Sequence, residues 1–126
     1  MVYGIGADLV QIDRMEKSLK SEAFWNRVFG EEERQLLLGL GEARRMQSAA
    51  ANFAAKEAFL KAIGTGIGGF ALHEIQAIRK QGGAPGFSFT GNAAQWVQQN
   101  GIKAHLTLSH DAGLAQAFVV LEQTEK

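Results

Sequence analysis

Two acidic residues stand at positions where a carboxylate is expected to do chemistry, and the first is Glu57. Helical spacing places Glu57 on one apolar face of a predicted long helix, together with Phe53 and Leu60. A carboxylate on such a face is destabilising unless it has a partner. The alternative is a rim position with a surface ion pair to Lys61, which contributes only about 0.3–0.5 kcal/mol. Periodicity alone favours that alternative, so a role for Glu57 requires a second residue beside it.

Asp8 is a candidate for that second residue. It ends a predicted strand in which Gly4, Gly6 and Asp8 point to one side, and two glycines leave that side bare for a ligand or another backbone. Alternatively, Asp8 caps the helix that begins near Ile12. If Asp8 and Glu57 lie together, their charges repel unless a cation lies between them. Two carboxylates are too few for Ca²⁺ but suit Mg²⁺, which retains waters and binds a substrate's phosphates.

The predicted elements that position these carboxylates give an α+β fold. Its antiparallel β-sheet packs against a long central helix, and residues 1–126 form a single domain. Apolar periodicity and turn residues predict helices over 12–20, 22–28, from 31, 42–63 and 93–99, and strands over 2–9, 72–80, 87–90, 102–109 and 114–122.

Composition excludes several classes of protein. The 126 residues suffice for one core, and 13 basic against 13 acidic residues lack the excess of positive charge typical of nucleic-acid binding. No cysteine is present, which excludes a cysteine nucleophile. The sequence has no charged leader and no run of about 20 apolar residues. We therefore expect a cytoplasmic protein that binds neither nucleic acid nor membrane.

A glycine-rich segment, Gly64-Thr65-Gly66-Ile67-Gly68-Gly69, directly follows the predicted long helix. It resembles a phosphate-binding loop only superficially. The segment follows a helix rather than a strand and lacks the Gly-Lys-Ser/Thr ending of nucleotide hydrolases. The sequence therefore does not indicate that class of enzyme.

The histidines differ in what their positions predict. Alternation along the strand places His105 on a polar face, where it is a candidate ligand contact. His110 lies on the opposite face and is expected to be structural, hydrogen-bonded near Asp111. His73 is expected at the surface. Their spacing does not indicate a zinc site.

Ordered motifs along most of the chain resemble a known family. Ile5-Gly6-Ala7-Asp8, followed by the run from Phe53 to Lys61, resembles the paired signature of phosphopantetheinyl transferases. The chain length, the glycine-rich segment after the helix and the run His105 to His110 resemble the short bacterial type, the holo-acyl-carrier-protein synthases. Either motif alone is weak, whereas the ordered set is specific.

The resemblance implies an enzyme that moves the phosphopantetheine group of coenzyme A onto a serine of an acyl carrier protein, in support of fatty acid biosynthesis. Asp8 and Glu57 would bind the Mg²⁺ that bridges the pyrophosphate of coenzyme A. Glu57 would also help to remove the proton of the carrier serine, directly or through water. Lys61 would reach the pyrophosphate. These three residues form the predicted catalytic set, while Lys56 points away from Glu57.

The resemblance also implies where the rest of coenzyme A binds. Arg44, Arg45 and His105 are candidates for the adenosine end, and Gly64, Thr65 and Gly66 would form one wall of the site. Two residues depart from the family pattern. Asn52 stands where relatives often have arginine, which would weaken the grip on a phosphate or transfer that task to Arg45. Thr107 replaces a common serine and retains the hydroxyl.

The expected protein partners are an acidic carrier protein and further copies of this chain. Arg14, Lys17 and Arg27 would contact the carrier, beside an exposed Met15. The alternative for these residues is a solvated helix face, because acidic residues alternate with the basic ones. The resemblance further implies a homotrimer with active sites between subunits.

Two other kinds of protein are alternatives to the enzyme. A non-catalytic module that binds a carrier protein or coenzyme A would be expected to lack Asp8, Glu57 or Lys61, and all three are present. A purely structural subunit of an oligomer would use the glycine-rich first strand as a packing surface. That second alternative is compatible with an enzyme whose sites lie between subunits.

Overall fold

A computed structural model describes residues 1–64 and 69–124 of the chain. No helix in these two ranges combines the length and apolarity needed to cross a membrane. In chain order the elements are β1 (Val2–Gln11), α1 (Ile12–Ser18), α2 (Glu22–Val28), α3 (Glu31–Leu38), α4 (Glu42–Ile63), the 3₁₀ turn η2 (Leu72–Glu74), β2 (Ile75–Arg79), β3 (Pro85–Phe89), α5 (Gly91–Gln99), β4 (Ile102–Asp111) and β5 (Leu114–Gln123).

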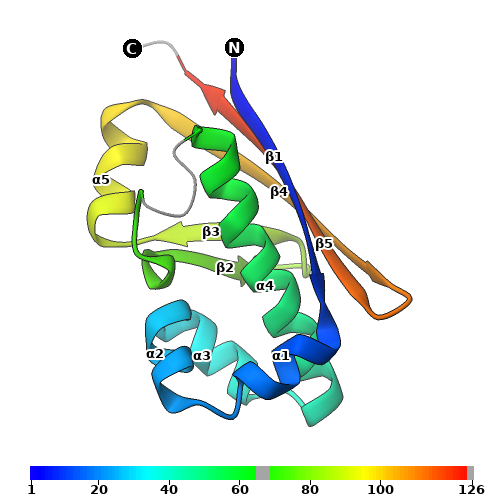
Figure 1. Ribbon diagram of the computed structural model, residues 1–126. Coiled ribbons are helices and arrows are strands. Elements are labelled where there is room, and N and C mark those ends of the chain that lie inside the picture. Colours follow the sequence, from blue (N-terminus) through cyan, green and yellow to red (C-terminus); the bar gives the residue numbers. More distant parts are fainter. Residues whose placement is uncertain (65–68, 125–126) are drawn as a thin grey trace.

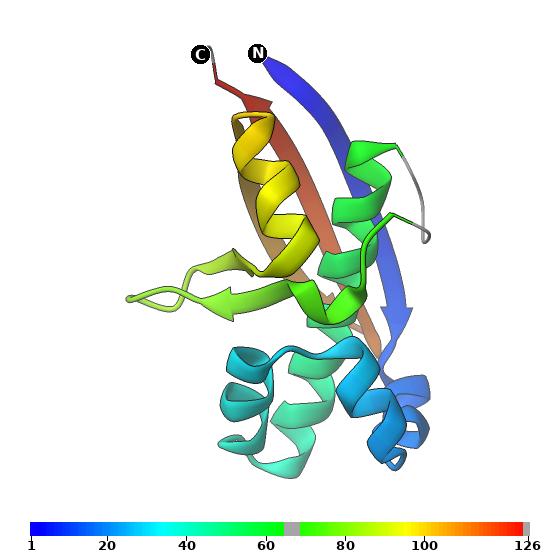
Figure 2. The same ribbon diagram turned by 90° about the vertical axis from the view of Figure 1, so that its left-hand side faces the viewer.

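The long helix α4 is the centre of the molecule (Figure 1). An antiparallel sheet of order β1-β5-β4 lies along one side of it, and a separate antiparallel pair, β2-β3, lies on the other with α5. The short helices α1, α2 and α3 gather around the start of α4 (Figures 1 and 2). The predicted α+β class is confirmed, with the strands divided between two sheets rather than one.

Direct backbone contact between β1 and α4 positions the two carboxylates. A Cβ added to Gly4 or Gly6 would collide with the carbonyl oxygen of Ala62 or Ala58, respectively. Only glycine permits this approach, so the bare side of β1 serves packing against a second backbone. The next residue on that side is Asp8, which is thereby held against α4.

The segment at 72–80 departs from its predicted structure. Leu72–Glu74 form a 3₁₀ turn, and the strand begins only at Ile75. The reason is the Nζ of Lys56, which donates hydrogen bonds to the carbonyls of Leu72 and Ile75 at 3.0 and 2.6 Å. Alternation of apolar residues does not reveal such a distant donor.

Other boundaries follow turn chemistry. The helices over 22–28 and 42–63 begin and end as predicted, whereas α1 ends at Ser18, two residues early. The strand predicted over 87–90 begins earlier, at Pro85. Proline is tolerated as the first residue of a strand, because its missing N–H is not needed there. Ala112 and Gly113, with φ of 51° and 77°, form the predicted turn between β4 and β5.

Candidate active site

Asp8, Glu57 and Lys61 lie together where β1 crosses α4. The Nζ of Lys61 donates to the Oδ1 of Asp8 at 3.0 Å and to the carbonyl of Ala7 at 3.1 Å. The side chain of Asp8 is 13% exposed and that of Lys61 is 55% exposed. Lys61 therefore pairs with Asp8 across two elements, instead of forming the intrahelical pair with Glu57 that the sequence left open.

The electrostatics of this cluster favour a cation. Burial raises the pKa of Glu57 to about 7. The negative charge of Asp8 and a hydrogen bond to it also raise this pKa, whereas the positive charge of Lys61 lowers it. The Oδ2 of Asp8 is buried and accepts no hydrogen bond from any described residue. Two adjacent carboxylates with an unsatisfied oxygen are suited to a divalent cation.

The number of ligands selects among cations. Within residues 1–64 and 69–124 there is no cluster of three or more histidine, cysteine, aspartate or glutamate side chains that could hold a metal. Asp8 and Glu57 alone therefore fit Mg²⁺, whose remaining ligands are water and phosphate oxygens, better than Zn²⁺ or Ca²⁺.

A cavity of about 480 Å³ connects Glu57 to the first two helices. Arg14 of α1 lines it together with Phe24 of α2 and Phe53 of α4. Met15 also lines it but is only 3% exposed, so the prediction that Met15 is an exposed contact for a partner is wrong: it packs in the core under α1.

The other residues predicted for the partner surface, all of them basic, lie outside that core. Arg14, Lys17 and Arg27 are all exposed. The guanidinium of Arg27 lies 6.0 Å from the centre of the Phe24 ring. A positive, partly aromatic surface therefore borders the cavity that contains Glu57.

The two arginines predicted for the adenosine end have different surroundings. Arg45 donates to the carbonyls of three residues that end α3 and follow it, Leu37, Leu38 and Leu40, at 3.0, 3.2 and 2.9 Å. Arg44 is exposed and lines another cavity, of about 280 Å³. The side chain of Arg45 thus satisfies carbonyl groups at the C-terminal end of α3. Arg44 is therefore the better placed of the two arginines to bind a ligand.

His105 and His110 have surroundings that differ from those predicted from the sequence. The Nε2 of His105 lies 3.0 Å from the Oε1 of Glu122, and the hydrogen bond between them is the main cause of a lowered pKa of Glu122. His110 is exposed, forms no hydrogen bond to a described residue and lines the cavity with Arg44. Its predicted structural hydrogen bond near Asp111 is absent among the described residues. His73 is exposed, as predicted.

The glycine-rich segment is described only at its ends. Gly64 ends α4 with φ of 86°, a left-handed conformation that favours glycine. Thr65 and Gly66, predicted to line the site, lie outside the described residues.

A buried ion pair supports α4 next to Glu57. The Nζ of Lys56 lies 2.5 Å from the Oε1 of Glu33, and both side chains are 0% exposed. Burial lowers the pKa of Lys56 to about 8, against the opposing charge of Glu33. The orientation of Lys56 away from Glu57 was predicted. Glu33 was not, because nothing distinguishes it from its neighbours Glu31 and Glu32 except its third position in the helix, which favours a bond to the preceding backbone N–H.

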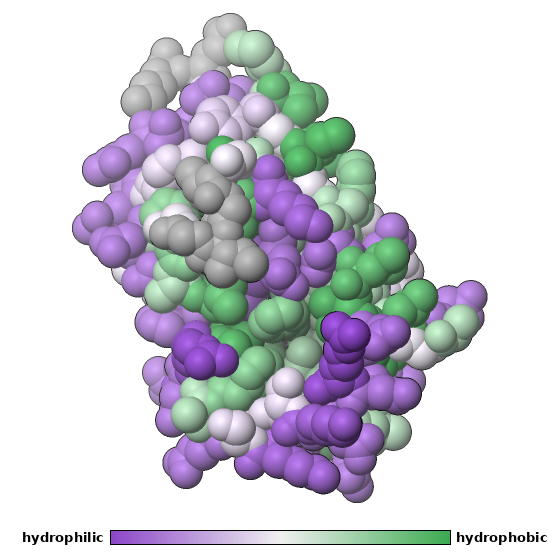
Figure 3. All heavy atoms as spheres, in the orientation of Figure 1, coloured by the Kyte–Doolittle hydropathy of each residue, from purple (hydrophilic) through white to green (hydrophobic). Residues whose placement is uncertain are grey.

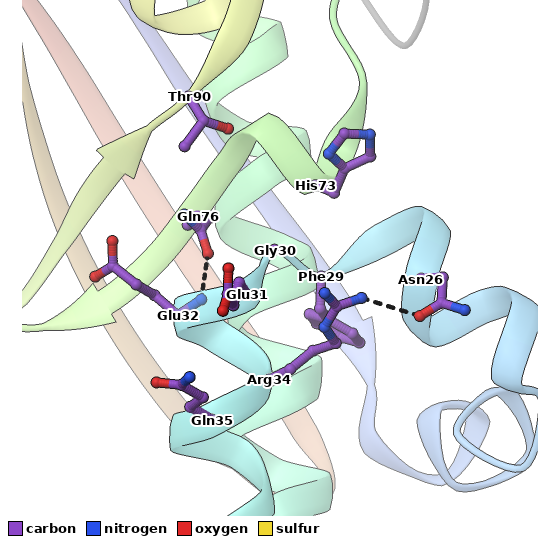
Figure 4. Close-up of a pocket in the computed structure, with 10 residues that line it drawn as sticks. All are labelled: Asn26, Phe29, Gly30, Glu31, Glu32, Arg34, Gln35, His73, Gln76 and Thr90. Carbon is purple, nitrogen blue, oxygen red and sulfur yellow. Dashed lines mark hydrogen bonds between the residues drawn. The ribbon is translucent and has the colours of Figure 1, made fainter.

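A larger cavity, of about 620 Å³, lies away from these carboxylates, between α3 and β2 (Figure 4). Its polar groups bond to one another: the Oε1 of Gln76 accepts from the N–H of Glu32 at 2.9 Å, and Arg34 donates to Asn26 at 2.9 Å. Asp8 and Glu57 carry the perturbed charge and the unsatisfied oxygen. Asp8 and Glu57, rather than the larger cavity, are therefore the candidate active site.

Two carboxylates and a lysine beside a cavity, in a small α+β domain, make up the candidate active site. Residues 4–118 match a family model described as the 4'-phosphopantetheinyl transferase superfamily. A holo-[acyl-carrier-protein] synthase of Clavibacter michiganensis is 40% identical over 124 residues, which cover 97% of each chain.

Solved structures agree with this match. The holo-[acyl-carrier-protein] synthase of Neisseria meningitidis superimposes with a TM-score of 0.88 and 35% identity, covering 98% of this chain and 100% of that one. The Bacillus anthracis synthase in complex with CoA (3',5'-ADP) gives 0.84 and 35%, covering 98% and 99%. The chain belongs to the 4'-phosphopantetheinyl transferase superfamily, and within it to the holo-acyl-carrier-protein synthases. It is an enzyme of the transferase class.

Proposed function

We propose that this enzyme transfers 4'-phosphopantetheine from coenzyme A to a serine of an apo-acyl carrier protein, with Mg²⁺ as cofactor. The observation that carries the proposal is the carboxylate pair of Asp8 and Glu57, with its unsatisfied oxygen, next to Lys61. The products are holo-acyl carrier protein and adenosine 3',5'-bisphosphate. The relatives' names support the substrates, and a cytoplasmic role in fatty acid biosynthesis is part of the proposal.

The reaction requires that the reacting groups be positioned and that the negative charge on the leaving phosphate be stabilised. The serine oxygen forms a bond to the β-phosphorus of coenzyme A, and the bond from that phosphorus to the bridging oxygen of the pyrophosphate breaks. Glu57 accepts the serine proton, directly or through a water. Lys61 stabilises the negative charge that develops on the leaving phosphate. A bound Mg²⁺, held by Asp8 and Glu57, would neutralise pyrophosphate charge.

The carrier protein would dock beside this site. Arg14 lines the same cavity as Glu57, and Arg14, Lys17 and Arg27 are exposed. Exposed cations attract an acidic partner and orient it before contact. This arrangement supports delivery of the carrier serine from the side of α1 and α2.

For coenzyme A, the geometry favours Arg44 over Arg45 at the adenosine end, because Arg45 is engaged with backbone carbonyls. Contacts from Gly64, Thr65, Gly66 and His105 stay predictions of the resemblance.

We further propose a homotrimer. The outward face of β1 and β5 exposes large apolar side chains, including Ile5 at 60%, Leu9 at 61% and Phe118 at 40%. Apolar surface is gathered along the side of the molecule that β1 forms (Figure 3). An exposed apolar face of this kind is typical of a protein interface, and the family resemblance supplies the second copy as its occupant.

Replacing Phe118 with Glu tests this interface. We expect the mass in solution to fall from that of a trimer to that of a monomer, because the substitution would bury a charge between subunits. Size-exclusion chromatography with light scattering measures it. Lys103→Glu, on the polar outward side of β4, should leave the trimer intact. A wild-type monomer, or a trimeric Phe118→Glu variant, would contradict the proposal.

The transfer itself is tested by mass spectrometry. Purified apo-acyl carrier protein is incubated with the enzyme, coenzyme A and Mg²⁺, with and without a chelator. We expect the carrier to gain the mass of one phosphopantetheine group, and the gain to disappear with the chelator. No gain with several carrier proteins and a folded enzyme would reduce the chain to a binding module.

Metal binding should depend on pH through Glu57. Because the folded-state pKa of Glu57 is raised from 4.5 to about 7, the metal-free fold binds this proton more tightly than the unfolded chain does. The contribution of this proton to the stability of the metal-free fold is then fully present below pH 4.5, and it is lost as the pH rises to about 7. Bound Mg²⁺ requires ionised Glu57. We therefore expect Mg²⁺ to raise the melting temperature strongly at pH 8 and little at pH 5.5. An equal effect at both pH values would contradict this assignment.

A further inference from the structure

The buried carboxylate of Glu33, in the first turn of α3, joins three elements of the fold. Its Oε1 accepts hydrogen bonds from the N–H of Gly30 at 3.0 Å and from the Nζ of Lys56 at 2.5 Å. Its Oε2 accepts from the Nδ2 of Asn52 at 3.2 Å and from the N–H of Ala77 at 3.1 Å. Asn52 and Lys56 lie one turn apart on α4, and Ala77 lies in β2. One carboxylate therefore ties α3 to α4 and to β2.

Lys56 adds further contacts to this network. Its Nζ also donates to the carbonyl oxygens of Leu72 and Ile75, at 3.0 and 2.6 Å, and it lies 5.7 Å from the centre of the buried Phe29 ring. Together with Glu33, these two carbonyls give each of the three donors of the ammonium group an acceptor. Since the side chain cannot change rotamer without breaking a buried hydrogen bond, the turn of α4 that carries Lys56 is fixed relative to α3 and β2.

Glu57 is the next residue along α4 and lies between two anchors of the helix. Lys56, directly before it, belongs to the buried ion pair. Ala58, directly after it, touches β1, since a Cβ added to Gly6 would lie 2.0 Å from its carbonyl oxygen. Asp8, on the same strand as Gly6, is hydrogen-bonded to Glu57. The position of Glu57 relative to Asp8 therefore depends on both anchors, and loss of either lets α4 shift at this turn.

We infer that Glu33 is a positioning residue: through Lys56 it holds Glu57 at the distance from Asp8 that a divalent cation requires. This inference rests on the proposed function, in which Asp8 and Glu57 hold Mg²⁺. Mg²⁺ demands near-ideal octahedral geometry at about 2.0–2.1 Å from each ligand, so a small displacement of one carboxylate weakens its binding. Residues that orient a metal ligand typically contribute about 10- to 100-fold to metal affinity or activity.

An apolar replacement of the ion pair separates positioning from stability. The double variant Glu33→Leu with Lys56→Met leaves neither buried charge without its partner. Calorimetric titration with MgCl₂ at pH 8, above the pKa of Glu57, measures metal affinity, and urea unfolding shows which variants are folded. We expect the folded double variant to bind Mg²⁺ about 10- to 100-fold more weakly than wild type. A pair that only stabilised the fold would leave the Mg²⁺ affinity of the folded enzyme unchanged.

Two single variants complete the comparison. Glu33→Gln retains the size of the side chain, but its NH₂ group faces donors where an acceptor is needed, so it should also weaken Mg²⁺ binding. It answers the same question if the double variant does not fold. Glu31→Gln changes an exposed carboxylate in the same turn of α3 and should bind Mg²⁺ with wild-type affinity.

The inference is overturned if wild type binds no Mg²⁺, or if the folded double variant or folded Glu33→Gln binds it as tightly as wild type does. It is also overturned if Glu31→Gln weakens binding as much as they do, because the effect would not be specific to the buried pair. The titration contains neither coenzyme A nor carrier protein. An enzyme whose Mg²⁺ affinity depends on Glu33 but that transfers nothing would therefore refute the proposed function and retain this inference.

Discussion

Glu57→Gln should reduce the turnover of phosphopantetheine transfer by about a thousandfold at saturating substrates, within the range known for loss of a general base. The amide has the size of the carboxyl group but accepts no proton. It also leaves Asp8 as the only carboxylate at the cation site, so the apparent affinity for Mg²⁺ should fall as well. Mass spectrometry of the carrier over time, at several Mg²⁺ concentrations, measures both effects.

The contrast with a surface carboxylate makes this result specific. Glu42 begins the same helix α4 and is exposed, so Glu42→Gln should retain full activity. Glu57→Gln should still bind the carrier protein, because Arg14 and its basic neighbours are unchanged, and fluorescence anisotropy of a labelled carrier measures this. If Glu57→Gln transfers at the wild-type rate with normal Mg²⁺ dependence, the assigned role of Glu57 is wrong.

The meeting of Asp8 with α4 was predictable because its causes are local. Alternation along β1 puts Gly4, Gly6 and Asp8 on one side, and helical spacing puts Glu57 on an apolar face. Those two patterns bring a bare strand against a helix that carries a carboxylate. The contact of Gly6 with the carbonyl oxygen of Ala58 is the structural result.

Interactions between distant residues could not be predicted in this way. Glu33 pairs with Lys56 and Arg79 bonds to Asn52, and neither pair has a fixed spacing in the sequence. Arg45 was predicted to bind a ligand because the sequence does not show that the last carbonyl groups of α3 take their hydrogen-bond donor from this side chain. These choices depend on tertiary packing, which decides which equivalent-looking charged residue becomes buried.

Lys56→Met should lower the free energy of unfolding by about 3–5 kcal/mol, because it leaves the buried carboxylate of Glu33 without its cation. The carbonyls of Leu72 and Ile75 would lose their donor as well. Methionine has an unbranched side chain of similar length, so little packing is lost. Urea unfolding followed by circular dichroism, at one protein concentration for all variants, measures the change.

Lys61→Met is the matched control, because Lys61 lies on the same helix and also pairs with an acid, but is 55% exposed. A pair whose lysine is exposed to solvent contributes about 1 kcal/mol or less, so the two variants should differ by several kcal/mol. Adding Glu33→Leu to Lys56→Met removes the unpaired charge and should restore part of the lost stability. If Lys56→Met destabilises no more than Lys61→Met, the buried pair does not support α4. If the second substitution adds a further loss, the hydrogen bonds that Glu33 accepts from Gly30, Asn52 and Ala77 stabilise the fold by more than the removal of its unpaired charge restores.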